Sequence, residues 1–225
     1  TPELDQMLFY LPLAGSTFKK VYYDENMGRA VSKFIPAEHL VVPYETSDLE
    51  TCPNITQTLR ISLNELRKKQ ISGFYLDIPV LPGQSEGDSV TDEINKIDGM
   101  SPNQIDYDCT LLECHVDLDI EGYEETDEDG EPTGIKVPYV VTISQDNGQI
   151  LSIRRNYRED DDMKRKIQYF VHYKFLPGFG FYGLGLIHTI GGLSRTATAA
   201  LRQLIDAGTL SNLPAGFKAR GLRIR

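Results

Sequence analysis

The stretch Phe175-Leu-Pro-Gly-Phe-Gly-Phe-Tyr-Gly-Leu-Gly185 separates two kinds of pattern in this 225-residue chain. Before it, short segments alternate apolar and polar residues, which predicts β-strands. After it, apolar residues recur every three or four positions from Leu186 to Ala207, which predicts a helix about 33 Å long at 1.5 Å per residue. Gly191 and Gly192 each weaken a helix interior by about 1 kcal/mol relative to alanine, so a kink or a fresh helix start is expected there.

The strand-like segments predict a body built from hairpins. Ser16–Asp24 and Arg29–Ile35 are separated by a short polar loop. Asp146-Asn147-Gly148 is a typical tight-turn sequence between two further predicted strands, Val137–Ser144 and Gln149–Tyr157. The remaining predicted strands are Leu40–Pro43, Ile55–Ile61, Leu112–Asp119 and Ile167–Phe175. Together these patterns predict an α+β fold with mixed or antiparallel sheets and a long C-terminal helix.

Short helices are also predicted within the body. Glu3–Phe9 carries leucines on one side, and Leu11-Pro12 should end it. Ser62 is a typical N-cap for a helix over Leu63–Lys69. A third short helix is predicted near Asp92–Ile97.

Three parts follow from this pattern. Residues 1–176 are predicted to form an α+β domain that contains an acidic, loop-rich insert at 84–134. Residues 177–210 hold a glycine hinge and the long helix, and 211–225 begin a basic, strand-like segment. Because the chain starts at Thr1 and stops inside that segment, we expect it to be a piece of a longer protein. The predicted hinge glycines are Gly178, Gly180, Gly183 and Gly185.

The net charge of −10 is unevenly distributed. Residues 1–153 carry 10 Lys and Arg against 28 Asp and Glu, a balance of −18, whereas residues 154–225 carry 13 against 5, a balance of +8. Two solvated faces of one domain would explain this asymmetry. The alternative is a basic element that meets an acidic partner or a polyanion.

Composition excludes several classes of protein. The chain is 40% hydrophobic and 25% charged, which is typical of globular proteins. No apolar run approaches the roughly 18 residues of a membrane span, and no signal-like segment opens the chain. Three cysteines cannot all pair, which favours a reducing compartment over a disulfide framework.

Two short patterns resemble enzyme motifs but lack the required context. Gly178–Gly183 matches the glycine spacing of a dinucleotide loop, yet aromatic residues fill the turn, and no second strand ends in an acidic residue about 20 positions later. Gly83–Gly87 matches a nucleophile elbow but lies in a polar, proline-rich stretch without a buried strand before it. We therefore expect no catalytic residues and no cofactor.

Metal-binding patterns are also incomplete. Glu125–Gly130 resembles the start of a calcium loop, but the twelfth position is Lys136 where a glutamate should close the site. Cys109, Cys114 and His115 have no second ligand pair, which leaves zinc unsupported. No metal site is predicted.

The long helix is the strongest functional candidate. Its apolar residues are spaced 4-3-4-3-4-3 and form a three-heptad seam at Leu186, Ile190, Leu193, Ala197, Ala200, Leu204 and Ala207. Arg195 and Arg202 are seven residues apart and share a face that could meet solvent, a partner or a phosphate. Packing on the protein's own sheet is the simpler alternative for the seam.

Three ordered blocks of the chain resemble the portal (head-to-tail connector) proteins of tailed bacteriophages, podovirus type. The first block joins Ala14–Asp24, similar to the family's G-x-x-x-x-K-V-Y-Y-D strand, with Phe34–Pro43, similar to its I-P-x-E-x-x-V continuation. Thr58–Phe74 fits the helix that follows. The last block is the glycine stretch 175–185 together with Gly192–Gly208.

This resemblance implies a role for each part of the chain. Residues 1–176 would form most of the wing, Leu186–Gly208 the first stem helix, and Leu213–Arg225 the start of the clip. Full-length subunits would form a dodecameric ring in the virion, assembled in the host bacterial cytoplasm, whereas this chain alone would be monomeric or weakly associated. Arg195 and Arg202 would be channel or subunit contacts.

The implied partners are terminase, capsid and tail proteins, and double-stranded DNA that passes without sequence recognition. Neither a membrane nor enzymatic activity is implied. Two alternatives stay open: a nucleotide-binding enzyme that uses the Gly178–Gly183 loop, and another virion adaptor protein that uses the helix for docking.

Overall fold

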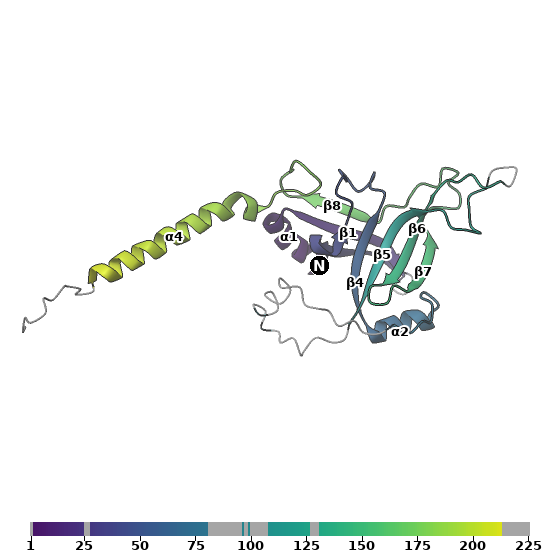
Figure 1. The fold of residues 1–225 in the computed structure, drawn as a ribbon, viewed down its shortest axis with the longest axis horizontal. Helices are drawn as coiled ribbons and strands as arrows, with labels where there is room; N and C mark the ends of the chain where they lie inside the picture. Colours follow the sequence, from purple (N-terminus) through teal and green to yellow (C-terminus); the bar gives the residue numbers. More distant parts are fainter. Residues whose placement is uncertain are drawn as a thin grey trace, which may run out of the picture.

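The computed structural model describes residues 2–24, 28–80, 96, 99, 108–126 and 131–212 (Figure 1). Its strands form two antiparallel sheets, one with the order β2-β1-β8 and one with the order β3-β4-β5-β6-β7. A long C-terminal helix projects away from this body (Figure 1). The predicted α+β fold, with hairpin-rich antiparallel sheets and a long last helix, is confirmed.

The elements lie close to their predicted positions. In chain order they are α1 (Pro2–Ala14), β1 (Ser16–Asp24), β2 (Arg29–Pro36), the 3-10 helix η1 (Ala37–His39), β3 (Leu40–Val41), β4 (Ile55–Ser62), α2 (Leu63–Ile71), β5 (Asp108–Leu118), β6 (Val137–Ser144), β7 (Ile150–Arg155), β8 (Phe170–Lys174) and α4 (Leu186–Asn212). The predicted helix near Asp92–Ile97 and the basic segment after residue 212 lie outside the described residues, apart from Lys96.

The predicted end of the first helix is wrong, because α1 continues through Pro12 to Ala14. Proline removes one backbone hydrogen-bond donor. Because α1 ends only two residues after Pro12, this loss affects only the last turn of the helix. Gly15 ends the helix with a φ of +89° while its N–H still bonds the Leu11 carbonyl at 2.9 Å. At the other end, the Glu3 carboxylate accepts a 2.7 Å hydrogen bond from the Phe34 N–H and so fixes α1 against β2.

The last helix also differs from its prediction. α4 runs without a break across Gly191 and Gly192, so the fresh start expected there is wrong. Glycine lowers helix stability but keeps its backbone N–H and C=O, so the hydrogen-bond ladder can continue. The helix extends to Asn212, past the expected end at Gly208.

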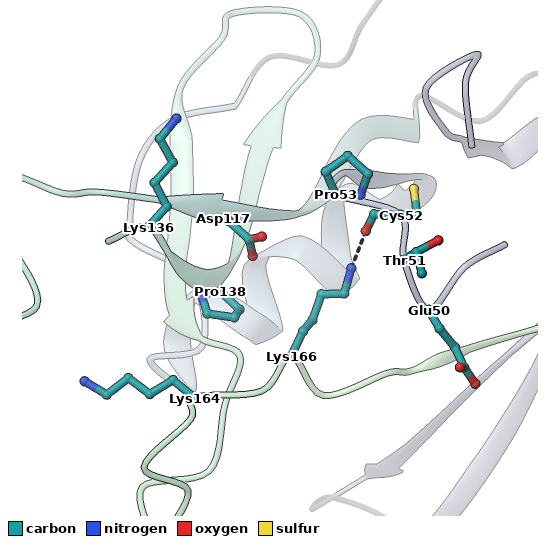
Figure 2. A pocket seen from close by; sticks show the side chains of 9 residues that line it. All are labelled: Glu50, Thr51, Cys52, Pro53, Asp117, Lys136, Pro138, Lys164 and Lys166. Carbon is teal, nitrogen blue, oxygen red and sulfur yellow. Dashed lines mark hydrogen bonds between the residues drawn. The ribbon is translucent and has the colours of Figure 1, made fainter. Parts of the chain in front are cut away.

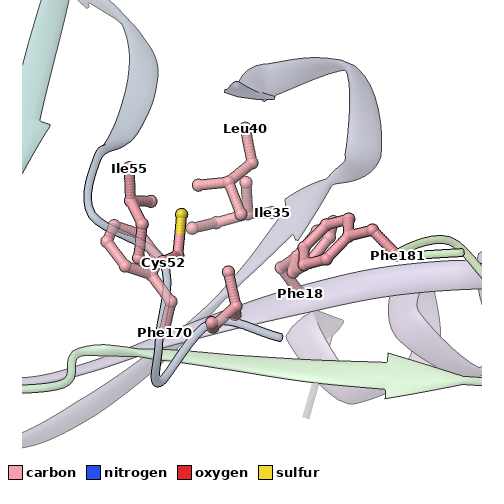
Figure 3. Close-up of a cluster of buried hydrophobic side chains, with 8 residues drawn as sticks. Phe18, Ile35, Leu40, Cys52, Ile55, Phe170 and Phe181 are labelled. Atoms are coloured by element: carbon pink, nitrogen blue, oxygen red, sulfur yellow. The ribbon is translucent and has the colours of Figure 1, made fainter. Parts of the chain in front are cut away.

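Three separate apolar clusters stabilise the body. One packs the three-stranded sheet against β3, β4 and the segment before β4 (Figure 3), and includes Phe18, Ile35, Leu40, Cys52, Ile55, Phe170 and Phe181. Another lies where α2 and the segment after it cover β4 and β5, and contains Ile61, Leu66, Tyr75, Cys109, Leu111 and Leu151. A third, smaller cluster on β6 includes Val137, Tyr139 and Val141.

A buried ionic contact joins the two sheets. Lys20 on β1 donates to Glu113 Oε1 on β5 at 2.5 Å, and His115 Nε2 lies 2.8 Å from the same oxygen. The Lys20 and Glu113 side chains are only 14% and 10% exposed. Burial acts to raise the pKa of Glu113, but the hydrogen bond with His115 and the charge of Lys20 outweigh it and lower this pKa to about 2.

We expect Glu113→Gln to destabilise the protein by about 3 kcal/mol, because the Lys20 ammonium would stay buried without its counter-ion. Urea unfolding at pH 7 measures this change. Glu45→Gln removes an exposed carboxylate and is the matched control, with a change within about 0.5 kcal/mol. Equal effects of the two substitutions would contradict the assigned role of the contact.

Acid should weaken the same contact. The pKa of Glu113 is about 2 in the folded protein and near 4.5 in the unfolded chain. The ionised carboxylate therefore makes its full contribution to the free energy of unfolding above pH 4.5. It disappears as the pH falls towards 2, with a loss of about 3 kcal/mol. Unfolding free energies measured between pH 6 and 2 should therefore fall more steeply for the wild type than for Glu113→Gln.

Candidate functional site

The C-terminal helix exposes a wide apolar surface. None of its side chains is buried, although α4 is 27 residues long. The predicted seam residues Leu186, Ile190, Leu193 and Leu204 are 40%, 49%, 72% and 72% exposed. Four more large apolar side chains, which the predicted seam does not include, extend the surface around the helix: Ile187, Leu201, Ile205 and Leu210. Packing of the seam on the protein's own sheet, the simpler alternative, is therefore not found.

Arg195 and Arg202 lie on the face opposite the seam. At 100° per residue, both arginines fall roughly 160–180° from Leu186 and Leu204 around the helix axis. A shallow depression runs along this face, and its lining also includes Gly191, Ser194, Thr198, Ala199 and Gln203. The helix therefore presents an apolar face and a cationic face.

The loop between β8 and α4 folds back on the body. Leu176 and Leu184 exchange two backbone hydrogen bonds of 3.3 and 2.8 Å, which closes the loop at its base. The four predicted hinge glycines all belong to this closed loop or its exit. The structure brings three of them against backbone atoms and leaves Gly180 with nothing within 4 Å of an added Cβ.

Gly183 and Gly185 pack directly on the turn between α1 and β1. A Cβ on Gly183 would lie 2.6 Å from the Gly15 carbonyl oxygen, and one on Gly185 would lie 2.3 Å from the Leu13 carbonyl oxygen. Gly178 faces the Tyr182 carbonyl at 2.5 Å in the same way. We call the contact of Gly15, Gly183 and Gly185 the glycine junction. No side chain larger than hydrogen fits there without a backbone shift.

Phe181 anchors the loop in the core. It is 7% exposed, with its ring 5.8 Å from Phe18 at an interplanar angle of 14° and 4.6 Å from His172. Ser16 Oγ accepts a 2.7 Å hydrogen bond from the Gly183 N–H and lies 3.2 Å from His172 Nε2. Burial, aided by the charge of Lys174, lowers the pKa of His172 to about 4, so this ring is neutral at pH 7.

No sequence pattern singles out this anchor, and Phe181 reads there as one aromatic residue of the predicted glycine hinge. Ser16 and Phe18 at the start of β1 contact the loop, but they lie more than 150 positions earlier in the chain. Only the pairing of β1 with β8 brings the two segments together.

The last residue of the candidate nucleotide loop and the two residues after it donate their backbone N–H groups within the protein. The Gly183 N–H bonds Ser16, the Leu184 N–H bonds the Leu176 carbonyl, and the Gly185 N–H bonds His188 Nδ1 at 3.1 Å. A phosphate-binding loop needs free N–H groups that point at the ligand. Of the loop itself, these contacts engage only the last donor, the Gly183 N–H.

The cysteine and histidine pattern of β5 can be followed in the described part of the chain. Strand alternation places Cys109 and His115 on one face of β5 and Cys114 on the other. Within the described ranges, no three His, Cys, Asp or Glu residues are grouped as metal ligands. The Gly83–Gly87 motif and most of the calcium-like segment lie outside the described residues.

A polar depression of about 350 Å³ lies beside the segment before β4 (Figure 2). Two of its three lysines are already engaged, because Lys166 Nζ donates to the Cys52 carbonyl at 2.5 Å and Lys164 forms an ion pair with Glu125. In Figure 2, Lys136 and Lys164 point away from Asp117. We find no pair of groups there arranged for proton transfer.

Comparison with protein-family models finds no matching family, and comparison with curated proteins finds no matching relative. Among the helices of the described residues, none combines the length and the apolar character that a bilayer crossing requires. The candidate site is therefore defined by geometry: a long exposed helix held by the glycine junction.

We expect Gly185→Ala to destabilise the protein by about 3 kcal/mol, because the new Cβ would overlap the backbone of Leu13 and Gly15. Gly180→Ala is the matched control from the same loop and should change stability by no more than about 0.5 kcal/mol. Urea unfolding followed by near-ultraviolet circular dichroism measures both. A Gly185→Ala protein as stable as Gly180→Ala would refute the tight packing.

Proposed function

We propose that this chain supplies the wing-like body and the first stem helix of a phage portal subunit. Such subunits form the ring at the capsid vertex through which DNA is packaged and released. Terminase, capsid and tail proteins would bind to that ring. The proposal rests on the resemblance in sequence and on one structural observation, the exposed two-faced helix α4.

The exposure of α4 supports assembly into an oligomer. Monomeric proteins rarely expose large contiguous apolar surfaces, and such surfaces typically mark protein interfaces. In a ring, the apolar seam of each α4 would pack against neighbouring subunits. The small residues Ala197 and Ala200 in the middle of the seam would allow a second helix to approach closely.

The cationic face gives the helix a second role in this proposal. Arg195 and Arg202 would face the channel or an adjacent subunit. Contacts between arginine and phosphate oxygens carry no sequence information, which suits a channel that must pass any DNA sequence. No catalytic residue, cofactor or metal is required of this chain.

The two alternatives can be separated from the proposal. A nucleotide-binding enzyme would show saturable binding of NAD or ATP by calorimetry, which we do not expect because aromatic residues fill the turn and the Gly183 N–H is bonded to Ser16. A different virion adaptor would also use α4 for docking, but it would not place twelve copies of the helix around one axis.

The decisive test is electron microscopy of the full-length gene product. We expect rings of twelve subunits with α4 near the central channel. Leu204→Lys should abolish these rings, because it places a charge in the apolar seam, whereas Gln203→Lys adds the same charge beside the seam and should preserve them. Leu204 is 72% exposed, so neither substitution should change the unfolding of this chain.

Two outcomes would refute the portal assignment. One is a full-length product that forms no ring, and the other is a ring whose α4 helices lie on the outer rim. Equal assembly of Leu204→Lys and Gln203→Lys would exclude the seam as the subunit contact.

A further inference from the structure

His172 lies where β8, β1 and the loop that leads to α4 meet. The helix leaves the body at its first turn (Figure 1), so its direction depends on the loop 176–185 and on the glycine junction. The centroid of the His172 ring is 4.4 Å from that of Phe18 and 4.6 Å from that of Phe181. A change in this one ring therefore reaches the base of α4.

Two hydrogen bonds in series connect the loop to His172. The Gly183 N–H donates to Ser16 Oγ at 2.7 Å, and Ser16 Oγ lies 3.2 Å from His172 Nε2. Ser16 is buried, and among the described residues its side chain has no further hydrogen-bond partner. The hydroxyl hydrogen of Ser16 is therefore satisfied only when Nε2 accepts it, which places the hydrogen of the neutral ring on Nδ1.

Protonation of His172 is incompatible with this arrangement. An imidazolium carries hydrogen on both nitrogens and accepts no hydrogen bond. The hydrogen of the Ser16 hydroxyl would then be buried without an acceptor, which is unfavourable. The new positive charge would also lie against two phenyl rings in place of water. Attraction between the imidazolium and the rings offsets part of this cost.

The surrounding charges do not favour the protonated ring. The titratable groups on the elements around His172 are Lys20 on β1, Lys174 on β8, Asp48 before β4, Tyr182 in the loop and His188 on α4. Burial, with the charge of Lys174, lowers the pKa of His172 to about 4. Asp48 interacts with Lys174, and Lys20 is paired with Glu113. Within the described ranges, no carboxylate lies at salt-bridge distance from His172.

We propose that His172 is an acid-sensitive latch, which holds α4 in one direction at neutral pH and releases it when the ring is protonated. In the closed state, the His172 ring packs on Phe181, and Ser16 holds the Gly183 N–H. In the open state, the ring turns towards solvent, Phe181 leaves the core and the loop 176–185 separates from β1. The latch operates within one chain and does not rest on the portal assignment.

Amide hydrogen exchange followed by NMR measures the opening of the loop. The N–H groups of Leu176, Gly183 and Leu184 report on the loop, and those of β6 report on the body. An open loop gives His172 the ordinary pKa of 6.5, so it binds a proton more readily than the closed loop and acid favours opening. The protection factors of the three loop amides should fall about tenfold between pH 7.5 and pH 5.

The β6 amides should keep their protection over the same pH range. An equal loss of protection in β6 would mean that the whole body unfolds, which would overturn a local latch. Loop amides whose protection does not change between pH 7.5 and pH 5 would overturn it as well.

Matched substitutions locate the titrating group. His172→Phe keeps a stacked ring that cannot be protonated, so the protection of the loop should no longer depend on pH. His39 is another half-buried histidine whose pKa is lowered by burial, and it lies in η1, outside the loop. His39→Phe should therefore retain the pH dependence of the wild type. The same pH dependence in both variants would exclude His172 as the latch.

The tautomer of His172 in the wild type gives a test that needs no substitution. Nitrogen-15 spectra of the ring at pH 7.5 should show hydrogen on Nδ1, because Nε2 accepts from Ser16. The same spectra at lower pH should show the ring titrating well below 6.5. Hydrogen on Nε2 at pH 7.5, or titration near 6.5, would contradict the proposal.

Discussion

The direct contact of backbone with backbone at Gly15, Gly183 and Gly185 is the constraint on which the arrangement of the other elements depends. Gly15 ends α1 and begins β1, while Gly183 and Gly185 end the loop from β8 and begin α4. Four elements therefore meet at one point where no side chain intervenes. Van der Waals packing of bare backbone leaves little freedom of position, and the hydrogen bond from Gly183 to Ser16 fixes the orientation further.

The two sheets are held together by a different kind of contact. Apolar clusters lie on both sides of Glu113, and this carboxylate is buried between them with Lys20 and His115. Burying an ion pair often contributes little net stability, but it allows only one alignment of its partners. Here the pair connects residues 93 positions apart and sets how β1 lies across β5. Apolar packing alone would tolerate neighbouring alignments.

The sequence predicted strands better than helix ends and long-range contacts. Strand patterns located β1, β4 and β6 within a residue, although β6 is buried along nearly its whole length and not on one face alone. The end of α1 was misplaced because Pro12 usually breaks a helix but is tolerated near its end. The two faces of α4 followed from spacing alone. By contrast, no local pattern distinguishes Glu113 from the other carboxylates of an acidic chain, or Phe181 from its exposed neighbour Phe179, because their partners lie far away in the sequence.

Because α4 is long, a small rotation at the glycine junction becomes a large displacement at the far end of the helix. The helix is about 40 Å long at 1.5 Å per residue, so a tilt of about 10° at its base would move its far end by roughly 7 Å. A contact made at that end would consequently be lost through a distortion too small to disturb the body. The accuracy with which the distal end is placed is therefore decided by three glycines at the opposite end of the helix.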